Sequence, residues 1–106
     1  MIEVEKKIYP NSTHYYIKGS ANKIWWYQHG ILHREDGPAM LHDDGTKLWY
    51  RYGKLHREDG PAVEWGDGRK EWYINDNYFD TKEEWFEALN ENQRMKAVYS
   101  EYFMRG

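Results

Sequence analysis

The segment LHREDGPA occurs twice without a change, at residues 32–39 and 55–62, and it determines how the chain is organised. The same spacing of 23 residues separates three Trp-Tyr pairs, namely Trp26-Tyr27, Trp49-Tyr50 and Trp72-Tyr73. A period between about 20 and 50 residues is typical of folds in which one small unit stacks on the next. The sequence therefore predicts a tandem array.

The segments between the octapeptides predict antiparallel β-hairpins. KIWWYQHG, KLWYRYG and KEWYIND are rich in aromatic and β-branched residues, and each predicts a strand of about six residues. A shorter strand is expected before two of them, at 39–42 and 62–65. Asp44-Gly45 and Asp67-Gly68 are typical hairpin turns between the strands of each pair. One unit is thus a hairpin, and the octapeptide is the crossover to the next unit.

Both ends of the array differ from the repeat. Residues 2–8 alternate apolar and charged side chains, and residues 14–18 predict another strand, with turns at 10–12 and 19–22. The first unit is therefore degenerate. After residue 79 the repeat ends, and residues 80–106 predict a helical tail. We expect one domain over residues 1–106, mainly β, with the hairpin repeats in 1–79 forming one elongated twisted sheet.

The tail predicts two helices that cover the end of the sheet. Thr81 and Glu84 have the spacing of a capping box, and Asn90 with Gln93 marks a second helix start. The expected apolar positions are Trp85, Phe86 and Leu89 in the first helix, and Met95, Val98, Tyr99, Tyr102 and Phe103 in the second. We expect the first group to be buried near Trp72 and Ile74.

Composition narrows the class of protein. The net charge of −3 is mild and its signs are interspersed, which argues against a nucleic-acid partner. The chain has no cysteine, and no stretch has the length of a signal peptide core or a membrane span. We expect a soluble protein of the cytoplasm that has no membrane partner and is a monomer or a small homo-oligomer.

The octapeptides contain side chains that bind metals in other settings, but their pattern favours a structural role. The spacing of His33, Glu35 and Asp36 matches no established metal motif, and Arg34 would repel a cation. We expect no metal and no cofactor, and ion pairs between the arginine of one crossover and an acid of the next. The candidate structural residues of the repeat are His33, Arg34, Asp36, Gly37, Pro38, His56, Arg57, Asp59, Gly60 and Pro61.

A catalytic role is not expected. The acids lie beside arginines or in Asp-Gly turns, where a carboxylate is solvated, and no serine lies in a nucleophile motif.

Aromatic side chains are the better functional indication, because they make up 18% of a chain with a strongly polar mean hydropathy. The candidate partner-binding residues are Tyr27, Tyr50, Tyr52, Tyr73, Trp26, Trp49, Trp72 and Arg51. Each Trp column and its Tyr column should face opposite sides of the sheet. An exposed row would bind a partner, whereas a row packed under Arg and Lys stems would be ordinary sheet surface.

The sequence motif WYxxGxLHREDGPA resembles the MORN repeat, and most closely the divergent MORN-like variant found in small bacteriophage and large-DNA-virus proteins. The resemblance covers residues 14–79 and is specific in the two octapeptides and the three Trp-Tyr pairs. It implies a row of β-hairpins and a binding or scaffold role without a catalytic centre. This chain has two full copies of the repeat, whereas arrays in the family are often longer. The small number of copies argues against a long concave groove.

Two functions follow as hypotheses. The first is a non-enzymatic protein-binding module, phage or viral in origin, that binds and inhibits a host protein in the host cytoplasm, for example a defence component. The alternative is a binder of small ligands or single-stranded nucleic acid, which would stack bases or sugars on an exposed aromatic row.

Overall fold

The computed structural model describes residues 5–8, 14–18 and 23–100. The strands are β1 (Glu5–Ile8), β2 (His14–Lys18), β3 (Ile24–Gln28), β4 (Ile31–Leu32), β5 (Met40–Leu41), β6 (Lys47–Leu48), β7 (Tyr50–Arg51), β8 (Lys54–Leu55), β9 (Val63–Glu64), β10 (Lys70–Ile74) and β11 (Asn77–Phe79). Two helices follow, α1 (Lys82–Ala88) and α2 (Glu91–Val98). The predicted fold class, mainly β hairpins with a short helical end, is confirmed.

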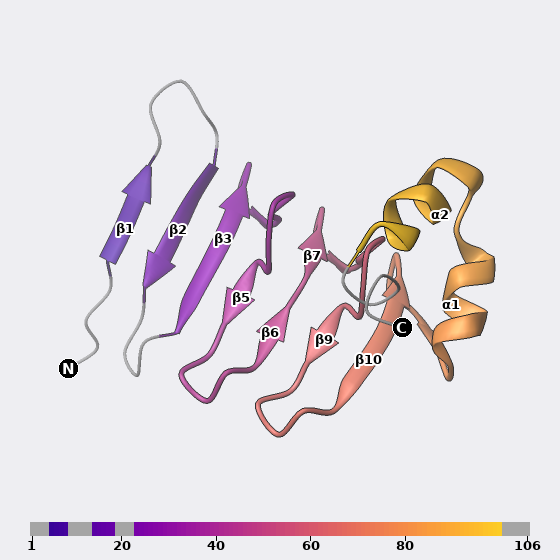
Figure 1. Ribbon diagram of the computed structural model, residues 1–106. Helices are drawn as coiled ribbons and strands as arrows, with labels where there is room; N and C mark the ends of the chain where they lie inside the picture. The colour runs from indigo at the N-terminus through magenta and orange to yellow at the C-terminus, as the bar shows by residue number, and fades with distance from the viewer. Residues whose placement is uncertain (1–4, 9–13, 19–22, 101–106) are drawn as a thin grey trace.

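Antiparallel pairing joins the strands into a long sheet and a small one. The long sheet has the order β1-β2-β3-β5-β6-β9-β10-β11, with β4 paired to β3 at its side. Figure 1 shows its strands side by side in a row, from β1 at one end to β10 and the helices at the other. β7 and β8 form a separate two-stranded sheet. In this hairpin the structure differs from the single sheet that the repeat predicts.

The predicted Asp-Gly turns are present. Asp44-Gly45 joins β5 to β6, and Asp67-Gly68 joins β9 to β10, with φ of +94° and +96° at the two glycines. The Asp44 carboxylate accepts a 2.8 Å hydrogen bond from the Thr46 N–H, and Asp67 accepts one of 3.0 Å from the N–H of Arg69. These bonds fix the turns and hold the pKa of both carboxyls below the ordinary value.

A second kind of hairpin turn follows each of the three Trp-Tyr segments and was not predicted. Its two-residue turns are His29-Gly30, Tyr52-Gly53 and Asn75-Asp76, and all six residues have positive φ. This is the type I′ turn, which suits the twist of an antiparallel pair. The turns reverse β3 into β4, β7 into β8 and β10 into β11. The Trp-Tyr segments are therefore shorter as strands than the six residues expected.

The middle Trp-Tyr segment is also split at its tryptophan. The Trp49 N–H donates to the carbonyl of Ala62 at 2.7 Å, and the Trp49 carbonyl accepts from the His56 N–H at 3.0 Å. Trp26 makes the same two bonds one unit earlier, with Ala39 and His33. Trp26 and Trp49 thus each bond both ends of the octapeptide that follows, the alanine at its end through the N–H and the histidine near its start through the carbonyl.

Both helices begin where the sequence predicts. The Thr81 hydroxyl accepts a 3.1 Å hydrogen bond from the Glu84 N–H, which is one half of the expected capping box. Asn90 and Gln93 form a complete capping box at the start of α2. No helix in the described part of the chain is both long and apolar enough to cross a membrane.

The helices bury their apolar residues unequally. In α1, Trp85 and Leu89 are buried as predicted, in a cluster with Trp72 and Ile74, whereas Phe86 is half-buried against this cluster. The predicted apolar face of α2 is exposed. Ala97 is the residue buried in this cluster, whereas the expected apolar positions Met95, Val98 and Tyr99 are exposed. Tyr102 and Phe103 lie outside the described residues, as do residues 2–4 and the turns expected at 10–12 and 19–22.

Candidate interaction site

The two octapeptide histidines join neighbouring units. Nδ1 of His33 accepts a hydrogen bond from the backbone N–H of Tyr52 at 2.9 Å, and Nδ1 of His56 accepts one from Asn75 at 3.1 Å. Both imidazoles are buried. Because Nδ1 is the acceptor, each ring carries its proton on Nε2. Each histidine therefore holds the I′ turn of the following unit.

The octapeptide arginines cover the tryptophan column. The guanidinium of Arg34 lies 4.2 Å from the ring centre of Trp26, and that of Arg57 lies 3.8 Å from the ring centre of Trp49. The third tryptophan, Trp72, has Trp85 of α1 as its neighbour, with ring centres 4.7 Å apart. The Trp85 indole N–H also donates to the Arg57 carbonyl at 3.0 Å. Helix α1 thus supplies the cover that an arginine supplies in the earlier units.

Both octapeptide arginines pair with an acid of their own crossover. Nε of Arg34 donates to Asp36 at 3.0 Å and Nε of Arg57 to Asp59 at 2.8 Å. Their Nη1 groups donate to the carbonyls of Pro38 and Pro61, at 3.2 and 3.1 Å. Each octapeptide therefore folds around its own arginine, and Nη1 of Arg57 also reaches Glu64 of β9 at 2.9 Å.

One octapeptide glycine, Gly37, lies against a side chain of its own loop, whereas Gly66 lies against the backbone of another loop. Gly37 and Gly60 are not among the residues with positive φ. A Cβ on Gly37 would lie 3.1 Å from the Arg34 guanidinium carbon, so this glycine makes room for the folded arginine side chain. The closest approach occurs at Gly66, where a Cβ would overlap the carbonyl oxygen of Asp44.

The tyrosine column is half-buried. Tyr27, Tyr50 and Tyr73 are each partly covered. Burial, followed by the hydrogen bond to Glu71, raises the pKa of Tyr73 to about 12. Of the candidate partner-binding residues, Tyr52 and Arg51 are exposed, although the Tyr52 ring lies on the His33 ring with centres 4.3 Å apart. The tyrosines and tryptophans therefore do not form a bare aromatic row over residues 23–100.

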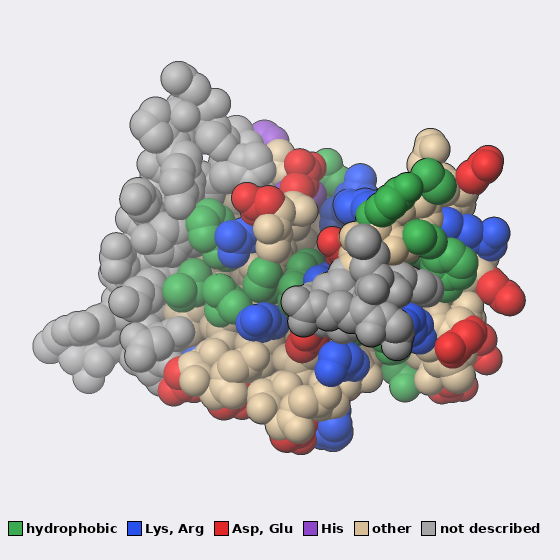
Figure 2. Space-filling model, in the orientation of Figure 1, with side chains coloured by type: hydrophobic (Ala, Val, Ile, Leu, Met, Phe, Trp, Pro, Cys, Tyr) green, Lys and Arg blue, Asp and Glu red, His purple; other side chains and the backbone are tan. Residues whose placement is uncertain are grey.

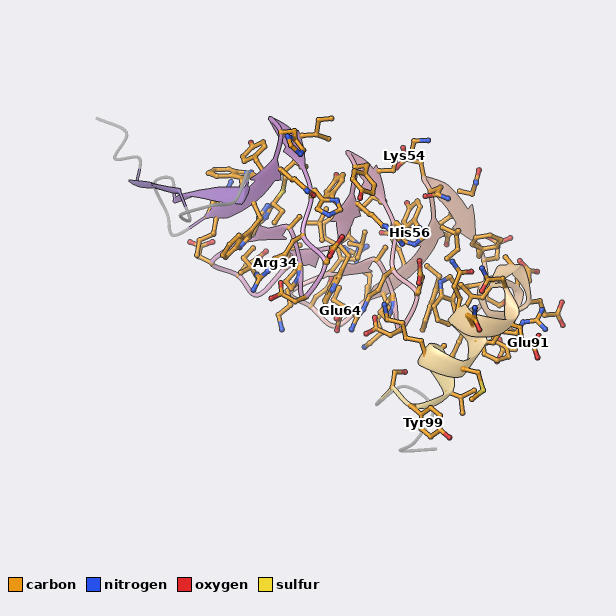
Figure 3. The ribbon with its side chains drawn as sticks, turned by 90° about the horizontal axis from the view of Figure 1, so that it is seen from above. Arg34, Lys54, His56, Glu64, Glu91 and Tyr99 are labelled. Carbon is orange, nitrogen blue, oxygen red and sulfur yellow. The ribbon has the colours of Figure 1, made fainter. Side chains whose placement is uncertain are left out.

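A pocket of about 610 Å³ lies where the two crossovers meet α2. Its lining residues are Arg34, Glu35, Asp36, Gly37, Pro38, Trp49, Arg51, His56, Arg57, Glu58, Asp59 and Lys96. Figure 3 shows Arg34, Glu64 and Tyr99 toward one side of the sheet and Lys54 toward the other. The repeat brings most of these residues together, but sequence reasoning missed Lys96 because helix α2 breaks the repeat.

Glu58 is the buried charge of this pocket. Its side chain is 11% exposed, whereas that of its counterpart Glu35 is 70% exposed. Glu58 Oε2 lies 2.7 Å from Nη1 of Arg51 and 2.7 Å from Nε2 of His56, and Oε1 lies 3.9 Å from Nζ of Lys96. Burial alone would raise the pKa of Glu58, but the hydrogen bond from His56 and the charges of Lys96 and Arg51 outweigh it and lower that pKa.

The identical octapeptides therefore have different surroundings. The position equivalent to Arg51 one unit earlier is Gln28, which carries no charge to hold Glu35.

In the described residues, no group of three His, Asp or Glu side chains is arranged to hold a metal ion. Comparison with family models, curated proteins and solved structures gives no match to this chain.

Proposed function

We propose that this chain is a non-enzymatic protein-binding module that binds and inhibits a host protein through the face that carries the pocket and α2. The observation that carries the proposal is the outer face of α2. Met95, Val98 and Tyr99 follow helical i, i+3, i+4 spacing and are 56%, 42% and 69% exposed. Exposed apolar side chains grouped on one helix are typical of a helix that contacts a partner.

The remainder of α2 is anchored, which makes this face a firm surface. Ala97 is buried against the α1 cluster, and Arg94 donates to the carbonyls of Phe86 and Glu87 at 3.2 and 2.7 Å. In Figure 2, hydrophobic side chains gather over the central strands and on the helices, with charged side chains between them. A surface that mixes apolar and charged groups in this way suits a protein partner.

Two further considerations support a binding role. The buried carboxylate of the pocket, Glu58, has a lowered pKa, the opposite of what a general acid needs near neutral pH. The guanidinium groups over Trp26 and Trp49 already occupy the positions where a base or sugar would stack. The origin of the partner in a host cell rests on the resemblance to MORN-like phage and viral proteins.

The test is an affinity capture from bacterial lysate with three forms of the chain, followed by mass spectrometry. The variant Met95→Gln/Tyr99→Ser removes apolar area from α2 without touching a buried residue. The control Ile31→Gln changes an exposed apolar residue of β4. We expect one protein to be captured by the wild type and the control and to be lost with the α2 variant. Equal capture by all three forms, or no specific capture, would contradict the proposal.

A further inference from the structure

The long sheet ends at an open strand edge in the last unit. In the first two units, Ile24 and Lys47 each pair outward with a residue of the following strand, β5 or β9. Lys70 holds the same position in the third unit. In the described part of the chain, Lys70 pairs with β9 on its inner side alone, because the pairing of β11 covers only residues 72–74. Figure 1 shows β10 as the last strand of the row, before the helices.

Helix α1 contains the residues that would form the missing strand. The strands that fill the two earlier edges are β5 and β9, and the same positions one period later are residues 86 and 87. Both lie within α1, which packs on Trp72 and so covers the upper part of the last unit. The edge at Lys70 is left uncovered, and Lys70 is exposed.

The backbone groups of Lys70 point away from the sheet. Hydrogen-bonded and non-bonded residue pairs alternate along an antiparallel ladder. The Trp65 N–H donates to the Arg69 carbonyl at 2.8 Å, so the next pair, Glu64 with Lys70, is not bonded. Lys70 therefore directs its N–H and its carbonyl outward, as Lys47 does toward β9 one unit earlier.

The segment that fills the equivalent edge in the second unit shows what fits there. Residues 62–64 are short and extended, and the carbonyl of Ala62 accepts a 2.7 Å hydrogen bond from the Trp49 N–H. Bonded pairs recur at every second residue, so Glu64, two residues further on, is in register to exchange hydrogen bonds with Lys47. The occupant of such an edge is thus an extended segment held by its main chain.

We infer that the edge at Lys70 binds an extended segment of a partner protein, which pairs antiparallel to β10 as one further strand. Strand addition of this kind is a recurring way in which an open sheet edge binds a peptide. A second copy does not fit through its own β10, because β11 stands on the same side of β10 and would meet the Asp67-Gly68 turn of the first copy. The edge consists of different residues from the exposed face of α2, so it adds a second surface to the proposed function.

The test measures binding of a fluorescently labelled peptide to the full chain by anisotropy. The peptide has the sequence GPAVEWG of residues 60–66, because this segment fills the equivalent edge inside the molecule. Lys70→Pro removes the outward N–H, whereas the matched control Lys70→Gln removes the same charge and keeps the N–H. We expect Lys70→Pro to weaken binding about tenfold, equivalent to ~1.4 kcal/mol, and Lys70→Gln to remain within about twofold of wild type.

A modified peptide gives a second measurement on the wild-type chain. N-methylation of the peptide at its glutamate keeps every side chain but removes the N–H that donates to the Lys70 carbonyl. We expect the methylated peptide to bind about tenfold more weakly than the unmodified one. Circular dichroism shows whether Lys70→Pro retains the fold, and if it does not, the methylated peptide alone decides.

Several results would overturn the inference. These are no binding of the peptide, equal binding by folded Lys70→Pro and Lys70→Gln, and equal binding of the methylated and unmodified peptides. A dimer of the free chain that the peptide dissociates would show that a second copy, and not a partner segment, occupies the edge. The variant Met95→Gln/Tyr99→Ser should bind the peptide as wild type does, and loss of binding there would place the peptide on α2 instead. Because this variant is the one expected to lose the captured protein, failure of the edge and failure of the proposed function are distinguishable.

Discussion

The imidazole of His33 accepts a hydrogen bond from the backbone of Tyr52, and the same bond recurs between His56 and Asn75 one unit later. Tyr52 and Asn75 have φ of 51° and 48°, a conformation that side chains with a Cβ adopt rarely. The histidine thus stabilises a turn that an aromatic residue would otherwise disfavour. It links the crossover of one unit to the hairpin of the next.

Replacing His33 by phenylalanine should destabilise the fold. The change keeps a ring of similar size but removes the acceptor, and an N–H without a partner costs about 1–3 kcal/mol. His33→Asn is the matched variant, because its amide oxygen can accept at a position close to that of Nδ1. Urea unfolding should show a larger loss for phenylalanine than for asparagine. Equal losses would show that the ring matters rather than the hydrogen bond.

Gly66→Ala should be far more harmful than Gly37→Ala. A Cβ at Gly66 meets the backbone oxygen of Asp44, and the Gly66 N–H donates to the Thr46 hydroxyl at 3.0 Å, so the two Asp-Gly loops are held close together. Forcing them apart should cost about 1–3 kcal/mol. At Gly37 the neighbour is the movable end of Arg34, and we expect less than about 1 kcal/mol. Thermal melts of both variants measure the difference.

Trp85→Ala should cost about 3–5 kcal/mol, because it empties the centre of the cluster around Trp72 and removes the hydrogen bond to Arg57. Tyr99→Ala is the control, since Tyr99 is an exposed aromatic residue of the same helical tail. Chemical denaturation should leave the control close to wild type. A Trp85 variant as stable as the control would show that α1 does not contribute to the fold.

Truncation after Phe79 extends this prediction to the whole tail. Removing α1 and α2 uncovers Trp72 and Ile74 together with the last hairpin. Leaving even two large side chains uncovered forfeits ~3–6 kcal/mol, comparable with the total stability of a small domain. We expect the fragment of residues 1–79 to self-associate in size-exclusion chromatography. A cooperative monomer by chromatography and circular dichroism would contradict the capping role.

Glu58→Gln should lower stability at pH 7 and less so in acid. The folded chain holds the Glu58 pKa below its ordinary value of 4.5. The carboxylate therefore contributes stability above that value, and the contribution is lost as the pH falls through the lower, folded pKa. Melting temperatures of wild type and variant between about pH 3 and pH 7 should converge at the acid end. Parallel curves across the whole range would contradict this role for Glu58.

The sequence predicts the features that depend on short separations. The period of 23, the Asp44-Gly45 turn and the helix starts at Thr81 and Asn90 each have a local signature, and the structure contains all of them. The I′ turn at Tyr52 was missed because tyrosine rarely adopts positive φ, and the hydrogen bond that Tyr52 donates there goes to His33, 19 residues earlier in the chain. Pattern alone does not reveal such a long-range bond.

The candidate site was harder to predict than the fold. The octapeptide pattern identifies the residues of the crossovers but not their partners. Arg34 and Arg57 fold back on acids of their own loop, and Gly37 leaves room for the guanidinium of Arg34. Lys96 approaches Glu58 only because α2 turns back over the second crossover, and this depends on packing around Ala97. Helical spacing predicts an apolar face on α2 but does not determine whether that face is buried, and Met95, Val98 and Tyr99 are exposed.

The contact between Trp85 and the last unit has a consequence for how such a chain can grow. The bonds from the backbone N–H of Arg34 to the Tyr50 carbonyl and from that of Arg57 to the Tyr73 carbonyl have the same separation along the chain, so these two junctions have the same geometry. A gene duplication of 23 codons would insert another unit that both neighbours accept unchanged. Helix α1 packs on Trp72 and Ile74 of the last hairpin and bonds the Arg57 carbonyl of the crossover before it, so it would close a longer array equally well. The number of hairpin units can then change by one unit at a time, while the helical tail that covers the last unit stays the same.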